Sequence, residues 1–191
     1  MGREFEVKYA ATEEDLACLA ERFPNLHPIA METTYYDTPD RILSRLHWTF
    51  RRRMENGVSV CTLKTPAAGL GRNEWEIPCG DIADAVDILC AQGAPEELKI
   101  FVSGGLIVSC GAKFTRLAAT LQIPDATVEI ALDRGILMGG GRELPFAEVE
   151  VELKEGSEDA ALRFARDLAA SRNLKPELRS KVARASALAE H

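Results

Sequence analysis

The sequence lacks the features that mark membrane proteins, zinc proteins and disulfide-bonded secreted domains. It has no run of about 18 apolar residues, which a membrane-spanning helix needs, and no apolar signal segment near its N-terminus. It has only three histidines, and its five cysteines contain no Cys-x-x-Cys pair. Neither zinc ligation nor a disulfide framework is therefore favoured. We expect free thiols and a cytoplasmic location.

Positive charge is also scarce. The 23 basic residues face 30 acidic ones, so the net charge is -7, and the isoelectric point is near 5.1. Nucleic-acid and anionic-membrane binders need a basic surface, so neither partner is expected. A local basic pocket is still compatible with this balance. The 191 residues, 46% of them hydrophobic, are enough for one domain over 1–191.

The hydrophobic pattern predicts a mainly β, α+β domain with antiparallel strands and helices outside the sheet. Thr12 and Ser157 are expected N-caps, and Gly139-Gly140-Gly141 is interpreted as a hairpin rather than a nucleotide loop. The expected helices run from Thr12 to Phe23, over 81–92, around 95–101, from Ser157 to Ser171 and over 176–189. The expected strands are 3–9, 32–36, 47–54, 58–64, 73–78, 105–110, 112–121, 126–133, 134–138 and 146–154.

The strands carry charged residues at every second position, which places them on one face. The first strand alternates Glu4, Glu6 and Lys8 with Phe5 and Val7. The same alternation gives further charged or polar sets: Glu148, Glu150, Glu152 and Lys154; Arg51 and Arg53; Thr62 and Lys64; Arg72, Glu74 and Glu76; Glu129 and Asp133.

A solvated sheet face is the ordinary explanation of such alternation. Carboxylates two residues apart on a strand lie roughly 7 Å apart, however, and repel one another unless cations lie between them. The helices also need apolar strand faces to cover, so the charged faces should point inward. This arrangement predicts a closed β-barrel around a polar tunnel. Glutamates would bind Mg²⁺ or Mn²⁺ there, and arginines and lysines would bind a polyphosphate.

The same residues resemble the motifs of the CYTH superfamily, also called the triphosphate tunnel metalloenzymes. The resemblance runs from residue 4 to residue 184 in the order of the family. Its motifs are Glu4-x-Glu6-x-Lys8, Tyr35-Tyr36-Asp37-Thr38-Pro39, Phe50-Arg51-Arg52-Arg53, Cys61-Thr62-Leu63-Lys64, Arg72-x-Glu74-x-Glu76, Phe114-Thr115-Arg116, Glu129 to Gly135, Glu148 to Lys154, and Ser180-Lys181-x-x-Arg184.

The resemblance implies a closed eight-stranded antiparallel β-barrel and the following site residues. Catalytic roles fall to Glu4, Glu6, Lys8 and Glu150. The implied metal ligands are Glu4, Glu6, Glu148, Glu150 and Glu152. Triphosphate contacts are implied for Lys8, Arg51, Arg53, Lys64, Arg116, Lys181 and Arg184. Weaker candidates are Arg72, Glu74, Glu76, Glu129 and Asp133. Arg52 departs from the family pattern and should face outward, at an edge that is open to solvent.

The activity implied is metal-dependent hydrolysis of inorganic tripolyphosphate to pyrophosphate and phosphate. The alternatives are a class IV adenylyl cyclase, a thiamine triphosphatase and a non-catalytic module that binds polyphosphate or nucleotides. The expected partners are tripolyphosphate or a nucleoside or other organic triphosphate, and the expected assembly is a monomer or homodimer. Substitution of Glu150 by glutamine should remove activity and leave the fold stable.

Overall fold

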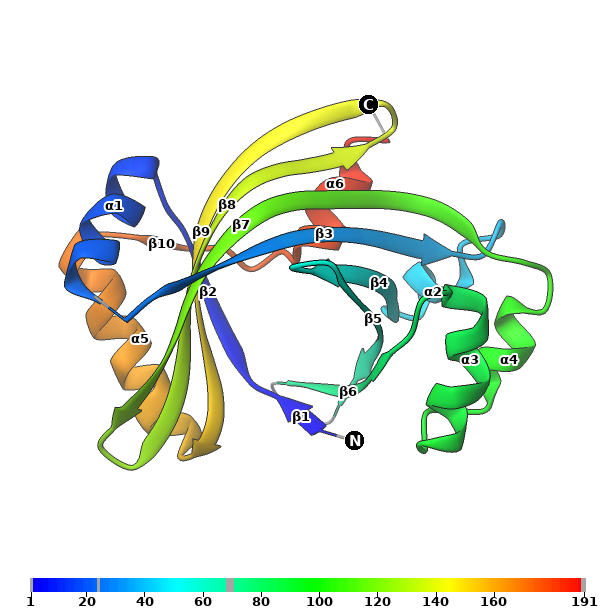
Figure 1. The fold of residues 1–191 in the computed structure, drawn as a ribbon, viewed down its shortest axis with the longest axis horizontal. Helices are drawn as coiled ribbons and strands as arrows, with labels where there is room; N and C mark the ends of the chain where they lie inside the picture. The colour runs from blue at the N-terminus through cyan, green and yellow to red at the C-terminus, as the bar shows by residue number, and fades with distance from the viewer. Residues whose placement is uncertain (1, 24, 68–70, 190–191) are drawn as a thin grey trace.

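One antiparallel sheet dominates the computed structural model, which describes residues 2–23, 25–67 and 71–189 (Figure 1). Its ten strands follow the order β1-β6-β5-β4-β3-β7-β8-β9-β2-β10. The strands are β1 (Gly2–Glu4), β2 (Glu6–Ala10), β3 (His27–Asp37), β4 (Thr49–Glu55), β5 (Val58–Pro66), β6 (Arg72–Pro78), β7 (Ile107–Ile123), β8 (Ala126–Gly139), β9 (Arg142–Gly156) and β10 (Lys175–Pro176).

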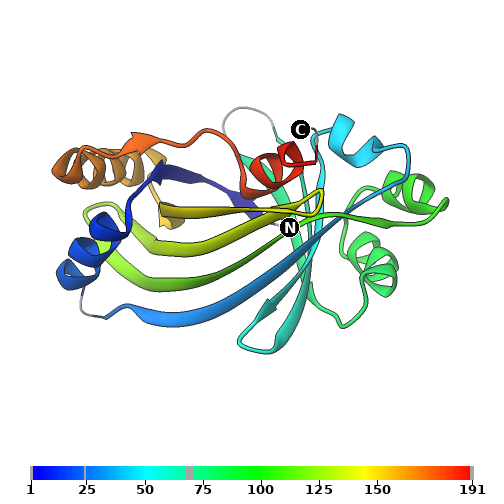
Figure 2. The ribbon, with the colours of Figure 1, turned by 90° about the horizontal axis from the view of Figure 1, so that it is seen from above.

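The helices lie mainly outside this sheet, in two groups at opposite ends of the molecule (Figure 2). They are α1 (Glu13–Arg22), α2 (Ile42–Arg45), α3 (Ile82–Ala91), α4 (Glu97–Val102), α5 (Glu158–Arg172) and α6 (Lys181–Ala187). Thr12 caps α1 and Ser157 caps α5, as predicted. No helix in the described part of the chain is long and apolar enough to cross a membrane.

Three apolar cores join helices and sheet. The first packs α1 and α5 against the apolar faces of β2, β8 and β9, where Val149 and Val151 are fully buried. The second packs α3 and α4 against β5 and β6 around Leu63 and Leu89. The third places α6 on the opposite, inner face of β7, β8 and β9. Helices thus cover the outer face of the sheet at its two ends, and the charged faces of the strands turn inward.

Phe5 interrupts the first strand and links the two ends of the sheet. β1 pairs with β6, whereas β2, only one residue further on, pairs with β9. The ladder itself runs from β1 to β10, and no hydrogen-bonded pairing closes it among the described residues. The mainly β, antiparallel prediction is confirmed, but a closed barrel is not shown. If β1 and β2 are counted as one strand and the two-residue β10 is omitted, the sheet has eight main strands.

Several strands are longer than the sequence predicts, among them β3, β7, β8 and β9. The predicted breaks at Gly111 and between Asp133 and Arg134 are wrong, because both stretches pair with neighbours on each side within β7 and β8. The last predicted helix also starts too early. Lys175 and Pro176 pair with β2, and α6 begins only after its N-cap Ser180.

Candidate functional site

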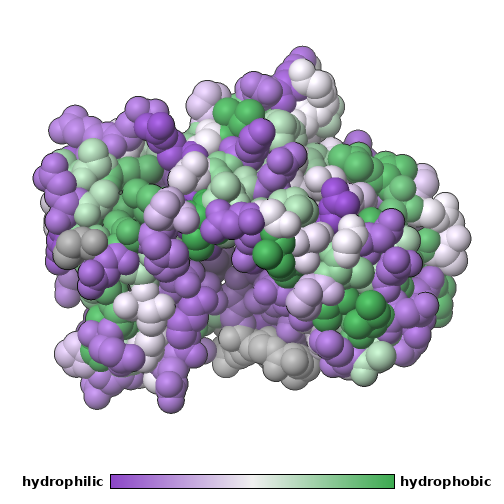
Figure 3. All heavy atoms as spheres, in the orientation of Figure 1, coloured by the Kyte–Doolittle hydropathy of each residue, from purple (hydrophilic) through white to green (hydrophobic). Residues whose placement is uncertain are grey.

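The inward charged faces enclose a cavity of about 720 Å³. Nine basic and eight acidic side chains line it. Figure 3, in the orientation of Figure 1, shows hydrophilic residues around a hollow in the middle of the molecule. A second cavity, of about 880 Å³, lies between α1 and the outer face of the sheet and is mainly apolar. None of the predicted metal or phosphate residues borders it. The charged cavity is therefore the candidate site.

Most of the predicted residues meet at this cavity. One wall, from the first strand and β7 to β9, carries Glu4, Glu6, Lys8, Arg116, Glu129, Glu150 and Glu152. The facing wall, from β4 to β6, carries Arg51, Arg53, Lys64, Arg72, Glu74 and Glu76, and α6 contributes Lys181. Glu148, Asp133 and Arg184 are not part of the lining. Their predicted placement on the wall is corrected: they lie behind it, where α6 covers the sheet.

A buried ion-pair network joins Arg116, Glu150 and Lys181 of the cavity lining to the residues behind it. Arg116 donates from Nε and Nη2 to the two carboxylate oxygens of Asp133, each at 2.8 Å. Lys181 Nζ lies 2.7 Å from Asp133 Oδ2 and 2.9 Å from Glu150 Oε1. Lys181 and Arg184 both pair with Glu148, and Arg116 pairs with Glu150. Three carboxylates and three cations therefore balance one another.

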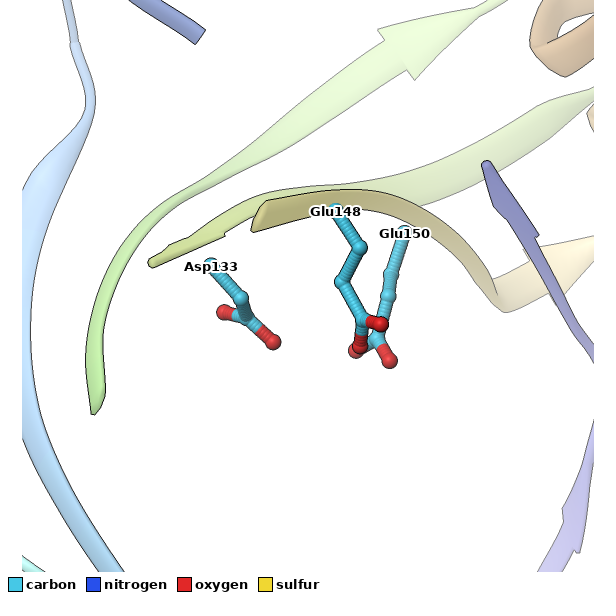
Figure 4. A group of neighbouring side chains, drawn as sticks. All are labelled: Asp133, Glu148 and Glu150. Carbon is cyan, nitrogen blue, oxygen red and sulfur yellow. The ribbon is translucent and has the colours of Figure 1, made fainter. Parts of the chain in front are cut away.

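The three carboxylates have oxygens within 4.8 Å of one another, a grouping that could hold a cation. Figure 4 shows Asp133 on β8 and Glu148 and Glu150 on β9, all turned to the same side. Asp133 and Glu148 are fully buried, and the positive charges beside them come from Arg116, Lys181 and Arg184. An ammonium group has three donors, and Lys181 already has three carboxylate partners. The ion pairs of Lys181 and Arg184 connect α6 to the sheet in this structure.

The two glutamates of the network have opposite pKa shifts. Burial opposes the charge of Glu150, but Lys181, Arg116 and Lys8 outweigh it and hold the pKa of Glu150 well below its usual range. Burial raises the pKa of Glu148, although Lys181 acts against this effect. Glu150 is consequently the firmly charged member, and its charge depends on the cations around it.

A row of glutamates runs across three neighbouring strands of the same wall. Glu152 on β9 lies opposite Glu6 on β2 and Glu129 on β8. Lys8 lies 2.8 Å from Glu6, and Lys154 lies 2.9 Å from Glu152 and 3.7 Å from Glu129. Burial raises the pKa of Glu152, Lys154 lowers it, and the charges of Glu4 and Glu129 raise it further. Negative charge is thus concentrated along this row.

The facing wall carries arginines with unused donors. The buried Nε atoms of Arg51 and Arg53 have no hydrogen-bond partner among the described residues. Arg53 pairs with Glu55 and lies 3.5 Å from Glu76, while Lys64 pairs with Glu4 and lies 3.4 Å from Glu74. Burial and the charge of Arg51 lower the pKa of Arg53. An anion between these two guanidinium groups would relieve both the repulsion and the unmet donors.

Two further arginines form hydrogen bonds to the backbone, and three charged residues of the cavity lining were not among the predicted site residues. Arg72 borders the cavity, but its guanidinium donates to the backbone carbonyls of His47 and Lys64, at 2.6 and 3.2 Å. Arg52 is not part of the cavity lining, and it donates to the carbonyl of Gly80. Arg52 thus faces outward, as predicted, and its hydrogen bond to Gly80 is exposed to solvent, although β4 itself has partner strands on both sides. Glu55, Lys154 and Arg179 also line the cavity. Alternation had placed Lys154 on the charged face, and continuing it from Arg51 and Arg53 would have added Glu55.

Comparisons with known proteins point to one family. The sequence profile of the CYTH domain matches residues 2–186. An inorganic triphosphatase from Haemophilus influenzae is 29% identical over an alignment of 146 residues, and the match covers 74% of this chain and 41% of the relative. The chain therefore spans about two fifths of the length of that curated protein.

Solved structures agree on the fold. A Hippeastrum protein described as an adenylyl cyclase candidate with a dominant triphosphatase activity superposes with a TM-score of 0.70 at 14% identity, over 98% of this chain and 96% of that one. The PH1819 protein of Pyrococcus horikoshii superposes with a TM-score of 0.66 at 21% identity, over 98% and 99% of the two chains. At these identities the likeness concerns the fold.

Proposed function

Because the chain belongs to the CYTH domain family, we propose that it hydrolyses inorganic tripolyphosphate, with Mg²⁺ or Mn²⁺ as cofactor. The observation that carries this proposal is the cavity with nine basic and eight acidic side chains. Binding of a neutral ligand would leave these charges unused, whereas a metal–polyphosphate complex offers charges of both signs. The inorganic triphosphatase relative supports the same substrate.

The phosphate chain is proposed to lie against the wall of β4 and β5. Arg51 and Arg53 have buried Nε donors that are still unused, and Lys64 borders the same cavity. Lys8 extends from the opposite wall. Burial works against its charge, but Glu6 and Glu150 raise its pKa, so it stays protonated. Charge-assisted hydrogen bonds from these groups would fix the terminal phosphate and neutralise the charge that develops on its oxygens.

A divalent cation fits the oxygen donors of the glutamate row. Glu6, Glu129 and Glu152 lie side by side on neighbouring strands, and carboxylate oxygens are the ligands that Mg²⁺ and Mn²⁺ prefer. We propose these three residues, together with Glu4, as the metal-binding set. Glu148 and Glu150 are less suited because Glu148 does not line the cavity and Glu150 is held by both Lys181 and Arg116. Such a cation supplies positive charge at the phosphoryl oxygens.

The reaction then follows from how the substrate is held. The oxygen of a water molecule attacks the terminal phosphorus, and the bond from that phosphorus to its bridging oxygen breaks. Pyrophosphate leaves with the bond's electron pair, and the proton of the water passes to solvent. The side chains described above orient the phosphate chain and stabilise its charge, which is the main source of catalysis in phosphoryl transfer.

The proposal includes the architecture around the site. β1 and β2 lie at or near opposite ends of the sheet and are joined through Phe5, which supports a tunnel of eight main strands closed by the chain itself. We propose that residues 1–191 act as one domain, as a monomer or homodimer, in the cytoplasm. The expected absence of nucleic-acid partners also stays a prediction.

A substrate panel tests the activity. Phosphate release should be fastest with tripolyphosphate, slower with ATP and thiamine triphosphate, and lost when EDTA removes the metal. A cyclic nucleotide product from ATP would favour the adenylyl cyclase alternative, and faster turnover of thiamine triphosphate would favour the thiamine triphosphatase alternative. Tight binding of tripolyphosphate with no turnover of any substrate would refute the enzyme proposal in favour of a binding module.

A further inference from the structure

The helix α6 packs against the inner face of the sheet, which places it beside the candidate site. Ala185 is fully buried there, together with Leu137 and Ala112. Figures 1 and 2 show α6 lying beside the end of the β8–β9 hairpin. Lys181 and Arg184 extend from this helix to Glu150 and Glu148. The position of α6 therefore decides where two of the three cations of the ion-pair network lie.

Gly139 has no side chain, and this allows α6 to approach the β8–β9 hairpin closely. A β-carbon at Gly139 would meet the carbonyl oxygen of Ala185 well inside the 3.0 Å below which such contacts are essentially never found. Backbone atoms cannot swing aside as a flexible side chain can. Any side chain at position 139 must push α6 away from the sheet.

Gly139 also differs from the two glycines that follow it. Gly140 and Gly141 form the two-residue turn and have φ of 57° and 74°, a conformation that favours glycine in hairpins. Gly139 has no positive φ, so alanine fits its backbone conformation. At Gly141 an added β-carbon would meet nothing within 4 Å. The two positions therefore separate the contact with α6 from the geometry of the turn.

Cys110 lies directly beneath α6 and can report on it. The residue is 4% exposed, and its Sγ lies 3.4 Å from Ser186 Oγ and 3.8 Å from the carbonyl oxygen of Val182. Both neighbours belong to α6. Displacement of the helix would uncover the thiol whether or not the protein has any substrate.

We propose that Gly139 is a positioning residue: its missing side chain seats α6 on the sheet and thereby fixes Lys181 and Arg184 against Glu150 and Glu148. When α6 is displaced, the site loses the positive charge of Lys181 from its lining and that of Arg184 from behind the lining, and it keeps its carboxylates. The site then becomes more negative and binds a triphosphate less well. The activity part of this inference rests on the proposed function, whereas the seating of α6 does not.

The first experiment compares Gly139→Ala with Gly141→Ala as the matched control. Each protein is treated with iodoacetamide, and the alkylation rate of the Cys110 peptide is followed by mass spectrometry. Gly139→Ala should raise that rate by about tenfold to a hundredfold, because a steric overlap shifts the local opening of α6. Gly141→Ala should leave it near that of the parent. Equal rates in Gly139→Ala and the parent would overturn the proposal.

The second experiment measures tripolyphosphate hydrolysis by the same proteins. Gly139→Ala should raise KM by roughly tenfold, with a smaller change in kcat, because the displaced charges alter substrate binding. Faster labelling of Cys110 with unchanged KM and kcat would overturn the link from Gly139 to the site. If the parent protein has no turnover, the proposed function fails, and the labelling experiment still decides the seating of α6.

A variant on the helix side guards against misfolding of Gly139→Ala. Ala185 is a fully buried residue of α6, so Ala185→Leu overpacks the same contact and leaves the sequence of the hairpin unchanged. It should raise the labelling of Cys110 as Gly139→Ala does. If Ala185→Leu melts cooperatively and its Cys110 is alkylated at the rate of the parent, the result would count against the proposed packing of α6 on Gly139.

Discussion

Removal of the charge of Glu150 tests the buried ion-pair network most directly. Glutamine at this position keeps the shape of the side chain but leaves the cations of Arg116, Lys181 and Arg184 facing only Asp133 and Glu148. The network changes from neutral to a net charge of one, in a region where both remaining carboxylates are fully buried. The sequence shows only a row of repelling carboxylates and predicts an unchanged stability, whereas the structure predicts a loss.

Breaking a buried ion pair from one side costs about 3–5 kcal/mol. In a chain of this length each kcal/mol lowers Tm by roughly 2–4 °C, so Glu150→Gln should melt roughly 6–20 °C below the parent. Differential scanning calorimetry at neutral pH and moderate salt measures this shift. The matched control is Glu13→Gln, whose carboxylate forms an exposed pair with Arg134 at 3.5 Å. Exposed pairs contribute less than about 1 kcal/mol, so this control should melt near the parent.

A double variant shows whether charge is the cause. Glu150→Gln with Lys181→Gln restores neutrality, so its loss of stability should be smaller than the sum of the two single losses by roughly 1–3 kcal/mol. Strict additivity would mean that the two groups do not interact. A Glu150→Gln protein that melts within about 2 °C of the parent, a shift under 1 kcal/mol, would refute the ion-pair reasoning.

Three further predictions concern the site and the fold. Arg53→Ala should raise KM for tripolyphosphate by about tenfold or more, since a charge-assisted hydrogen bond contributes about 1.5–3 kcal/mol. Arg52→Ala, on the other face of β4, should leave KM unchanged, and equal effects in steady-state kinetics would disprove the assignment. Chelation by EDTA should stop tripolyphosphate hydrolysis, with recovery on addition of Mg²⁺ or Mn²⁺; persistent activity in metal-free buffer would contradict the proposed cofactor. Hydrogen bonds from the backbone and side chain of Thr12, together with Arg172, lower the pKa of Asp15 below 3.8, so its carboxylate stabilises the fold above pH 3.8 and less as the pH falls through the lower folded value. Asp15→Asn should cost about 1 kcal/mol at neutral pH, and this cost should disappear as the pH falls below the lowered pKa of the folded state; a constant difference in urea unfolding across this range would argue against the capping interaction.

Local patterns in the sequence were enough for most elements. The Thr12 and Ser157 caps, the glycine turn after Gly139 and the alternation in the strands depend on residues that are close together in the chain. Errors arose where a distant partner overrides the local signal. Gly135 interrupts the pattern but stays inside β8, between Phe114 on β7 and Phe146 on β9. The rings of these two phenylalanines meet with centroids 5.6 Å apart.

Some features of the candidate site could likewise be predicted from the sequence, and others could not. Alternation places Glu4, Glu6 and Lys8 on one face, and the resemblance to a family gathers them with Arg51 and Arg53. Neither could place Glu148 and Arg184 behind the wall, because that depends on how α6 covers the sheet. The free cysteines, in contrast, followed from their number and spacing, and all five are unpaired.

The sequence alone determined which side chains share a face, because the two-residue period of a strand is local geometry. It also determined that charges of both signs must meet inside, since the apolar faces are needed by the helices. Only the tertiary structure decided how those charges pair. An ion pair depends on distances of a few ångströms between residues far apart in the chain, such as Lys181 and Asp133 at 2.7 Å. Those distances depend on the curvature of the sheet and on how α6 packs against it. Neither can be predicted from a local sequence pattern.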